Sequence, residues 1–421
     1  MKILFSLSIK SLWNRRVSVA LTAFSISISV LLLLGVEKIR TQTRDGFTQT
    51  ISGTDLIVGA RSGPVQLLLY SVFHIGDATN NIAWSSYQEI TRHPSVAWTV
   101  PISLGDSHRG FRVMGTSSDY FQYYRYARDG QLAFQSGKPF ADLFDAVVGA
   151  EVAETLQYQP GQKIVLAHGL GRISFTEHDD KPFRVVGILA RTGTPVDKSV
   201  LVSLEAIEAI HVDWQHGTMP QPGQSISADH ARQLQLQPKT ITAFMVGLKS
   251  KIATFQLQRA INEFAAEPLS AILPGVALQQ LWGMLSMVET ALLAVSACVA
   301  LAGLLGLSSA LLTSLNERRR EMAILRSVGA RPWHIFGLLI AESAIIALAG
   351  CGLGILCLYM GIMLLAPVMQ SAWGIVLSFT LPGPFEYVVV TAIVSAAIMI
   401  ASIPAWLAYR QALNDGMMPR L

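Results

Sequence analysis

Charged residues are scarce in this chain. Asp, Glu, Lys and Arg make up only 14% of the 421 residues, whereas 51% of the residues are hydrophobic. In a soluble domain about a quarter of the residues are charged, so this composition predicts a membrane protein. The formal net charge of +4 is too small to indicate a protein that binds nucleic acid.

Cysteine is also rare, and the positions of the three cysteines are informative. Cys298, Cys351 and Cys357 all lie in the C-terminal third of the chain. No disulfide can therefore stabilise the residues that precede Cys298, and any domain formed there needs a hydrophobic core of its own.

The motifs of common hydrolases are absent. The sequence contains no G-x-x-x-x-G-K-[ST] phosphate-binding loop, no G-x-S-x-G and no H-E-x-x-H. In "QSGKPF" the Gly-Lys pair precedes a proline in a predicted loop, so it is not a phosphate-binding loop. We therefore expect a non-catalytic protein, and any uphill transport must draw its energy from a partner or a gradient.

Long hydrophobic runs, in contrast, are abundant. A helix needs about 20 apolar residues to cross a bilayer. Four runs reach this length, at residues 17–36, 290–315, 335–369 and 387–409. Their only charged residue is Glu342. The first run is longer than the core of a usual signal peptide, so we interpret it as a retained anchor. Pro367, Pro382 and Pro384 predict a break between the last two runs.

Basic residues near the ends of these runs predict the orientation. Four lie in the first 16 residues and five arginines lie between residues 318 and 331, whereas the loop between the last two runs has none. Both termini and the Arg-rich loop are therefore predicted to be cytoplasmic. The predicted segments are an N-terminal segment 1–16, a span 17–36, an extracytoplasmic domain 37–280, a span 284–315, a cytoplasmic loop 316–333, a span 335–366, an external loop 367–385, a span 386–409 and a cytoplasmic tail 410–421.

The region between the first two spans alternates predicted strands with short helices. "TDLIVGA", "FRVVGIL" and "SVLVSL" read as strands, and "KIATFQLQRAINEFAAE" predicts an amphipathic helix with Ile252, Phe255, Ile261 and Phe264 as its apolar positions. We expect a large α+β domain, entered and left by helices that continue the spans. Such helices are stiff along their axes and could transmit a displacement across the membrane.

The stretch "SLNERRREMAILRSVGARPW", residues 314–333, places dense charge between two apolar spans. Read as a helix, it interleaves acidic and basic side chains and presents a short apolar surface. Gly329 suits the position just after a helix, and Pro332 can start the next one. This combination is typical of a docking element. The alternative, arginines that only set topology, explains the basic residues but not the glutamates and the apolar positions.

Several of these segments resemble MacB/FtsX-type ABC permeases, a group that includes macrolide exporters, lipoprotein-release permeases and a cell-division permease. "NERRREMAILRSVGARPWHIFGLLIAES" resembles the cytoplasmic loop and the start of the third span. "VVGAEVAETL" and "FRVVGIL" resemble parts of the periplasmic core domain, and "IPAWLAYRQALNDGM" resembles the tail. The chain lacks the fused ATPase of macrolide exporters, so it is similar to the stand-alone permeases.

The resemblance implies a fold and a set of partners. The fold is four transmembrane helices with an α+β periplasmic core-like domain inserted between helices 1 and 2. The protein would be a multi-pass permease of the bacterial inner membrane, paired with an identical or different second permease, membrane lipids, an ABC ATPase subunit that binds ATP and Mg²⁺, and a periplasmic client or adaptor. ATP hydrolysis would then do work on the client by mechanotransmission, with no cofactor bound to this chain directly.

Two sets of residues follow from this picture. The ATPase-docking residues implied by the resemblance are Glu317, Arg318, Arg320, Glu321, Met322, Leu325, Val328 and Gly329. Small residues at helix contacts favour close packing in membranes, and the candidates are Ser296, Ala300, Gly303, Gly350 and Gly354. For any one of these small residues the alternative is a lipid-facing position that tolerates a small side chain.

Three other interpretations remain open. The chain could be an ATP-independent membrane-anchored scaffold or binding protein. It could be a gradient-coupled carrier that uses Glu342, although such a residue more often reaches the interface or pairs with a nearby arginine. It could also be a metal-handling ABC permease, with His168, His178 and Asp180 as candidate zinc ligands. Their spacing matches no compact metal motif, and scattered histidines are usually surface groups.

Overall fold

The computed structural model describes residues 12–13, 15–127, 130–168, 180–213, 226–317, 324, 327, 329–373 and 382–414. The chain divides into two compact units. One consists of Met1–Thr43 and Leu285–Leu421, and we call it the helical bundle. The other is Arg44–Met284, and we call it the core domain.

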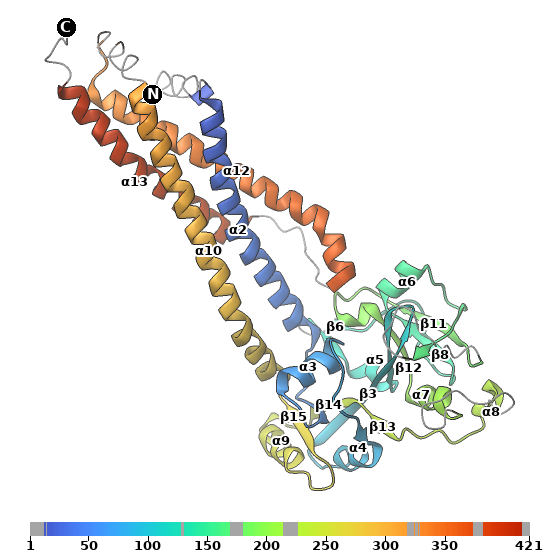
Figure 1. Ribbon diagram of the computed structural model, residues 1–421. Coiled ribbons are helices and arrows are strands. Elements are labelled where there is room, and N and C mark those ends of the chain that lie inside the picture. The colour runs from blue at the N-terminus through green and yellow to red at the C-terminus, as the bar shows by residue number, and fades with distance from the viewer. Residues whose placement is uncertain are drawn as a thin grey trace. The chain divides into compact units, whose positions relative to one another are not determined.

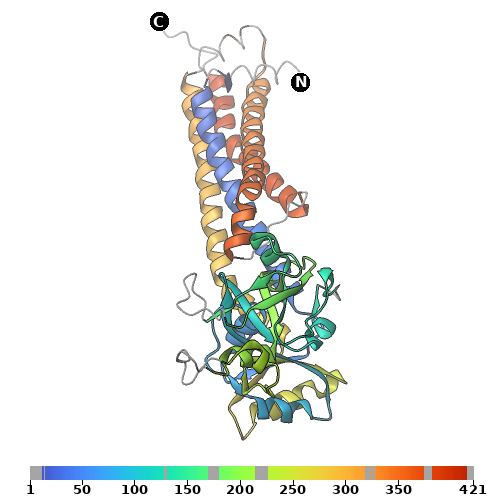
Figure 2. The same ribbon diagram turned by 90° about the vertical axis from the view of Figure 1, so that its right-hand side faces the viewer.

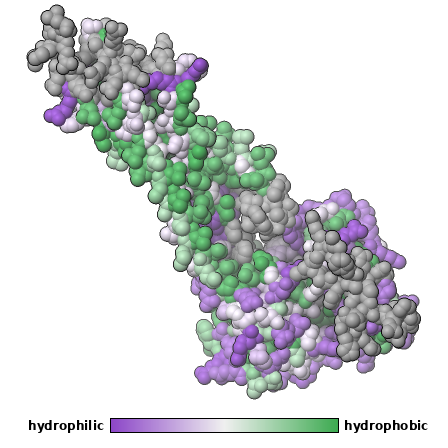
Figure 3. Space-filling model, in the orientation of Figure 1, coloured by the Kyte–Doolittle hydropathy of each residue, from purple (hydrophilic) through white to green (hydrophobic). Residues whose placement is uncertain are grey.

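The helical bundle is built from long helices (Figure 1). They are α2 (Arg16–Thr50), α10 (Pro274–Glu317), α12 (Pro332–Trp373) and α13 (Pro384–Asn414). By length and composition, four segments within them can cross a membrane: Arg16–Gln42, Pro274–Thr313, Pro332–Ala366 and Pro384–Leu407. The bundle is correspondingly apolar over much of its surface in Figure 3. These are the four spans expected from the sequence.

Prolines mark the starts of these helices. Pro274, Pro332 and Pro384 each occupy the first helical position, where the missing N–H group costs nothing. The break predicted between the last two spans is confirmed, because Pro382 and Gly383 lie outside any helix. Pro367 itself does not end α12, which continues to Trp373. Transmembrane helices tolerate such prolines because neighbouring groups satisfy the freed backbone carbonyl.

The core domain contains a large mixed sheet in the order β15-β1-β14-β3-β4-β12-β8-β11-β7, with β10 added to β3 and β9 to β11. The strands are β1 (Leu56–Ala60), β3 (Val96–His108), β4 (Phe111–Thr116), β7 (Phe134–Gly137), β8 (Asp145–Val148), β9 (Lys163–Ile164), β10 (Ala167–His168), β11 (Phe183–Leu189), β12 (Ser199–Ser203), β14 (Ala243–Leu248) and β15 (Leu269–Ile272). Two short pairs stand apart, β2 (Ile82–Ala83) with β13 (Thr240–Ile241) and β5 (Arg125–Tyr126) with β6 (Gly130–Gln131).

The long strand β3 joins the two halves of this sheet. Its first part pairs with β14, from Leu248 opposite Val96 to Ala243 opposite Ile102, and its second part pairs with β4. Most pairings are antiparallel, but β12 runs parallel to β4, and β11 runs parallel to β8. The core domain is therefore a mixed α+β fold, as the sequence predicted.

Short helices cover the sheet (Figure 1). They are α3 (Pro64–Val72), α4 (Trp84–Thr91), α5 (Asp119–Tyr123), α6 (Ala150–Leu156), α7 (Leu204–His211), α8 (Ala228–Ala231) and α9 (Thr254–Asn262). Strand residues alternate between the hydrophobic clusters on the two sheet faces: Val147 belongs to one cluster, and Ala146 and Val148 belong to another. Burial on both faces explains why these strands are almost continuously apolar.

One predicted apolar face is wrong. Ile252 and Phe255 are 92% and 72% exposed, whereas Leu257 and Ile261 are buried. The segment Lys251–Ala253 is a 3₁₀ helix, and α9 begins only at Thr254. Thr254, Leu257 and Ile261 are spaced by three and four residues, so they share the buried face, and Phe255 points away from it.

Candidate functional site

The connection between α10 and α12 carries the predicted docking residues. Glu317 is the last residue of α10. Arg318, Arg320, Glu321, Met322, Leu325 and Val328 lie outside the described residues. Gly329 has φ of +97°, a left-handed conformation that favours glycine. This supports its predicted place in a turn; its role in docking stays a prediction.

The start of α12 is fixed by a local hydrogen bond. The backbone N–H of Arg331 donates to Nδ1 of His334, at 3.0 Å. Because Pro332 is the first residue of α12, His334 is the third, and its side chain reaches back to the residue before the helix. This pattern resembles a capping box with His in place of Glu or Gln, a signal that sequence reasoning missed.

The small residues on α12 lie against α2. A Cβ atom added at Gly350 would lie 2.9 Å from the Ala23 carbonyl oxygen, and one added at Gly354 would lie 2.7 Å from that of Ser27. These distances are too short for any larger side chain to fit without movement of α2. Gly350 and Gly354 are therefore positions of close backbone contact.

The predicted packing residues on α10 differ in how closely they approach another helix and in how deeply they are buried. A Cβ atom at Gly303 would lie 3.0 Å from Ser25 Oγ, so α10 also approaches α2 here, and Figures 1 and 2 show these helices side by side. Ser296 is buried, and its hydroxyl donates to the Leu292 carbonyl oxygen at 2.8 Å within α10. Ala300 is only partly buried.

An ion pair links α2 to the start of α13. Lys38 Nζ lies 3.4 Å from Glu386 Oε1, and both side chains are about one-tenth exposed. Glu386 also accepts the backbone N–H of Gly383, and Lys38 Nζ lies 5.7 Å from the ring centroid of Tyr359. Sequence reasoning missed this contact because 348 residues separate the two charges.

Glu342 is buried within the bundle. Its exposed fraction is 2%, and it lines a cavity that Arg15 also lines.

The candidate metal ligands are not brought together in the described part of the chain. Asp180 Oδ2 lies 2.6 Å from Lys181 Nζ and forms an ion pair with it. His178 and the side chain of His168 lie outside the described residues. Among the residues that the structure does describe, no group of three or more His, Cys, Asp or Glu could hold a metal ion. The zinc site stays a prediction.

Lys181 instead forms a buried ion pair. Its side chain is fully buried, and Nζ lies 3.0 and 2.9 Å from the two carboxylate oxygens of Asp213. Burial alone would raise the pKa of Asp213, but the hydrogen bonds from Lys181 and the Ile226 N–H outweigh it and hold this pKa below its usual value. Lys181 lies just before β11 and Asp213 just after α7, so the pair connects these two elements. Asp213 also accepts the N–H of Ile226, which precedes α8.

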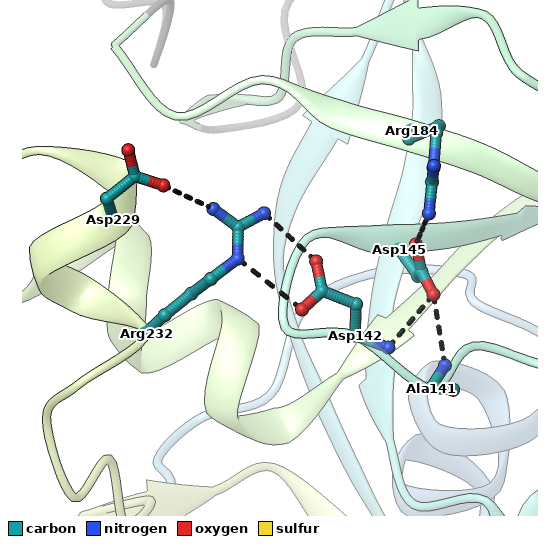
Figure 4. Close-up of polar contacts among 6 residues, drawn as sticks. All are labelled: Ala141, Asp142, Asp145, Arg184, Asp229 and Arg232. Atoms are coloured by element: carbon teal, nitrogen blue, oxygen red, sulfur yellow. Dashed lines mark hydrogen bonds and ion pairs between the residues drawn. The ribbon is translucent and has the colours of Figure 1, made fainter.

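A second polar cluster anchors α8 (Figure 4). Arg232 donates through Nε and Nη2 to both carboxylate oxygens of Asp142, the shorter bond being 2.9 Å, and Nη1 pairs with Asp229. The hydrogen bond from Arg232 lowers the pKa of Asp142. Asp145 accepts the N–H groups of Ala141 and Asp142 and pairs with Arg184.

None of these clusters brings together a nucleophile, a base and an oxyanion site in the described residues. The fold defines a multi-pass membrane protein with a large α+β domain inserted between its first two spans. Residues 19–264 match the family described as MacB-like periplasmic core domain, and residues 293–417 match the family described as FtsX-like permease C-terminal. The first match spans more than half of the chain, which therefore belongs to the MacB/FtsX type of ABC permease.

Two solved structures are similar to part of the chain. The periplasmic region of MacB from Actinobacillus actinomycetemcomitans is 10% identical, with 55% of this chain and 94% of that chain covered and a TM-score of 0.33. The extracellular domain of the ABC-type transporter YknZ from Gram-positive bacteria is 13% identical, with 52% and 99% covered and a TM-score of 0.31. No curated protein matches the chain. The resemblance predicted from the sequence is confirmed by the two family matches.

Proposed function

We propose that this chain is the non-catalytic permease subunit of an ABC complex, in which a separate ATPase drives work on a periplasmic client. The family implies an ABC ATPase partner and dimerisation. In the proposed complex two permeases, identical or different, pair with two ATPase subunits that bind ATP and Mg²⁺. The protein lies in the bacterial inner membrane with both termini in the cytoplasm and the core domain in the periplasm.

One observation carries the mechanical part of the proposal. α2 and α10 are each a single helix that includes both a membrane-spanning segment and residues of the core domain. An α-helix is stiff along its axis because each turn is hydrogen-bonded to the next. A displacement produced at the cytoplasmic connection after Glu317 would therefore reach the core domain through α10, without a substrate crossing the bilayer.

Docking is tested by charge reversal in the connection. Glu317→Arg with Glu321→Arg should abolish co-purification of the ATPase and its stimulation by the permease, because a partner surface that fits carboxylates repels arginines. The matched control is Glu263→Arg, an exposed carboxylate just after α9, which should leave both unchanged. ATPase binding that survives the double reversal would contradict docking. A chain that works with no ATPase would instead be an ATP-independent scaffold.

The helical link is tested separately by breaking α10. Met287 is 79% exposed in α10, close to the division between the two units. Met287→Pro removes a backbone hydrogen bond and kinks the helix, and Met287→Ala preserves it. We expect both variants to bind the ATPase, but only the alanine variant should keep an ATP-induced change in the distance between spin labels on the two core domains. If the proline variant kept the ATP-induced change in distance, the mechanical link would be refuted and the docking proposal would be unaffected.

A further inference from the structure

The helical bundle contains a cavity of about 360 Å³. It is lined by residues of α2, α10 and α12 and by residues just before α2, all within one unit. Its polar lining includes Arg15, Ser18, Thr22, Ser309, Thr313 and Glu342. Charged and hydroxyl-bearing groups are costly within a membrane-spanning bundle, so a cavity that collects them indicates a polar occupant.

The helix ends place this cavity along the bundle. Arg15 immediately precedes α2, and Thr313 lies four residues before the end of α10 at Glu317. Glu342 lies ten residues after the start of α12 at Pro332, which corresponds to roughly 15 Å of helical rise. The cavity therefore lies toward the bundle end where α10 and α12 are connected, within reach of the depth at which lipid headgroups meet hydrocarbon.

The cavity opens on the surface of the helical bundle. Leu21, which is 65% exposed, and Gly306, Ser309 and Thr313, which are also exposed, belong to its lining. Glu342 lies deeper, with an exposed fraction of 2%, and Arg15 is partly exposed. A cavity that combines apolar residues, hydroxyl groups and charges of both signs suits a molecule that has an apolar tail and a zwitterionic head.

We propose that this cavity binds the headgroup of a zwitterionic phospholipid with a primary amine, its phosphate at Arg15 and its ammonium at Glu342. A guanidinium presents paired N–H donors that match a phosphate, and a carboxylate can accept hydrogen bonds from an ammonium. The chain's own contacts do not prevent this, because a guanidinium has five N–H donors and a carboxylate has several acceptor positions. Basic groups between transmembrane helices bind lipid phosphates, and the carboxylate of Glu342 in the same cavity favours a head that also carries a cation.

The hydroxyl groups complete this assignment. Thr22 donates its hydroxyl hydrogen to the Ser18 carbonyl oxygen at 2.9 Å, which leaves the lone pairs of Thr22 Oγ1 to accept a hydrogen bond. An ammonium has three donors, so it can use both a carboxylate and such oxygens. Lipid binding here does not depend on an ATPase, and it can therefore fail or succeed independently of the proposed function.

The test is native mass spectrometry of the purified full-length permease with added phosphatidylethanolamine or phosphatidylglycerol. The wild type should retain phosphatidylethanolamine preferentially. Arg15→Gln should reduce retention of both lipids by about tenfold, the effect of losing one strong charge-assisted contact. Glu342→Gln should abolish the preference between the lipids, because only phosphatidylethanolamine carries the ammonium.

Two further variants separate the cavity from charge in general. No atom lies within 4 Å of a Cβ atom at Gly306, so Gly306→Leu fits the helix and fills the cavity mouth, and it should reduce retention of both lipids. Arg16→Gln removes an exposed neighbouring charge outside the lining and should change nothing. Cys351 is 1% exposed, so its protection from thiol reagents reports that each variant's bundle is folded.

Several outcomes would overturn the proposal. Wild-type retention in a folded Arg15→Gln or Gly306→Leu variant would show that lipid binds elsewhere. An unchanged preference in Glu342→Gln would refute the ammonium assignment. Binding of inorganic phosphate without retention of either lipid would identify a free-anion site instead.

Discussion

The helical bundle is stabilised by one kind of internal contact and the core domain by another. In the bundle, α12 lies against α2 where Gly350 and Gly354 leave room for the α2 backbone. In the core domain, strands such as β8 are buried on both faces, and an ion pair between Lys181 and Asp213 lies inside. The hydrophobic effect does not drive helices together in lipid, so close packing of the helices stabilises the bundle. In the core domain, the hydrophobic effect drives the burial of apolar side chains.

This difference predicts which substitutions harm each unit. A buried charge that loses its partner should be most damaging in the core domain, because the group left behind stays desolvated. An added side chain should be most damaging in the bundle where two backbones meet. The predictions below test the core domain first and then the bundle.

The largest effect should come from Lys181→Met. It leaves the Asp213 carboxylate, whose side chain is 1% exposed, without its counter-ion. Removing one partner of a buried pair costs about 3–5 kcal/mol, so the free energy of unfolding of the core domain should fall by this amount. In the full-length protein without its native cysteines, a reporter cysteine at the buried Ala209 becomes reactive only on unfolding, and its labelling against urea measures the loss.

Two matched variants sharpen this result. Arg259→Met breaks an exposed pair with Glu263 on α9 and should change stability by less than about 1 kcal/mol. Lys181→Met with Asp213→Leu removes both charges and should recover most of the loss, since an apolar pair of similar size is tolerated in a core. If Lys181→Met proved no more harmful than Arg259→Met, the ion pair would not stabilise the core domain.

The next effect is a pH dependence set by His74. Burial, with a smaller contribution from the nearby Arg112, lowers the pKa of His74 to about 4. The unfolded chain, with a histidine pKa of about 6.5, therefore binds the proton more readily between these values. This contribution to stability is complete above pH 6.5 and is lost as the pH falls toward 4. Because the His74 side chain is partly exposed, solvent screening keeps the loss below about 3 kcal/mol.

His74→Asn should flatten that part of the stability profile. Asn tolerates the positive φ of +56° at this position, so the backbone need not change. Urea midpoints can be followed between pH 7 and pH 4.5 with the same reporter cysteine and a pyridyl disulfide, which reacts at acidic pH. His230→Asn, at an exposed histidine of α8, is the control. Parallel profiles for His74→Asn and the wild type would refute the assignment.

Sequence reasoning found what is local and missed what is distant. Continuous apolar runs predict the four spans. Single residues predict the helix start at Pro332 and the turn at Gly329, because their effect is confined to the neighbouring backbone. The pairing of Lys38 with Glu386 could not be predicted, because helix packing brings it together across the chain. The pairing of Lys181 with Asp213 depends on the fold around β11 and α7 in the same way.

Two errors were local and have physical causes. Phe255 was named with Ile252 and Ile261 as an apolar position of one helix, but Lys251–Ala253 is a 3₁₀ turn and α9, which begins at Thr254, buries another face. Pro367 was grouped with Pro382 and Pro384 as a helix breaker, but α12 continues through Pro367 and the break lies at Pro382 and Gly383. Of the candidate docking residues, the structure describes only Glu317 and Gly329. The docking role of the whole set stays a prediction.

The smallest effect concerns close packing in the bundle. Gly354→Leu would place its Cβ atom 2.7 Å from the Ser27 carbonyl oxygen and 2.8 Å from Val30 Cβ, which forces α2 and α12 apart. Overpacking of this kind costs about 1–3 kcal/mol. Cys351 lies one turn away on α12 and is 1% exposed, so its thiol should become reactive in lipid nanodiscs once Cys298 and Cys357 are replaced by serine.

Gly352→Leu is the matched control, because no atom lies within 4 Å of its Cβ position. Both substitutions improve intrinsic helix propensity equally, so any difference between them comes from the contact with α2. We expect Cys351 to stay protected in Gly352→Leu and to react in Gly354→Leu. Equal protection would mean that α2 can yield to a larger residue at no cost, and the glycine would then reflect tolerance of a small residue, not a requirement for one.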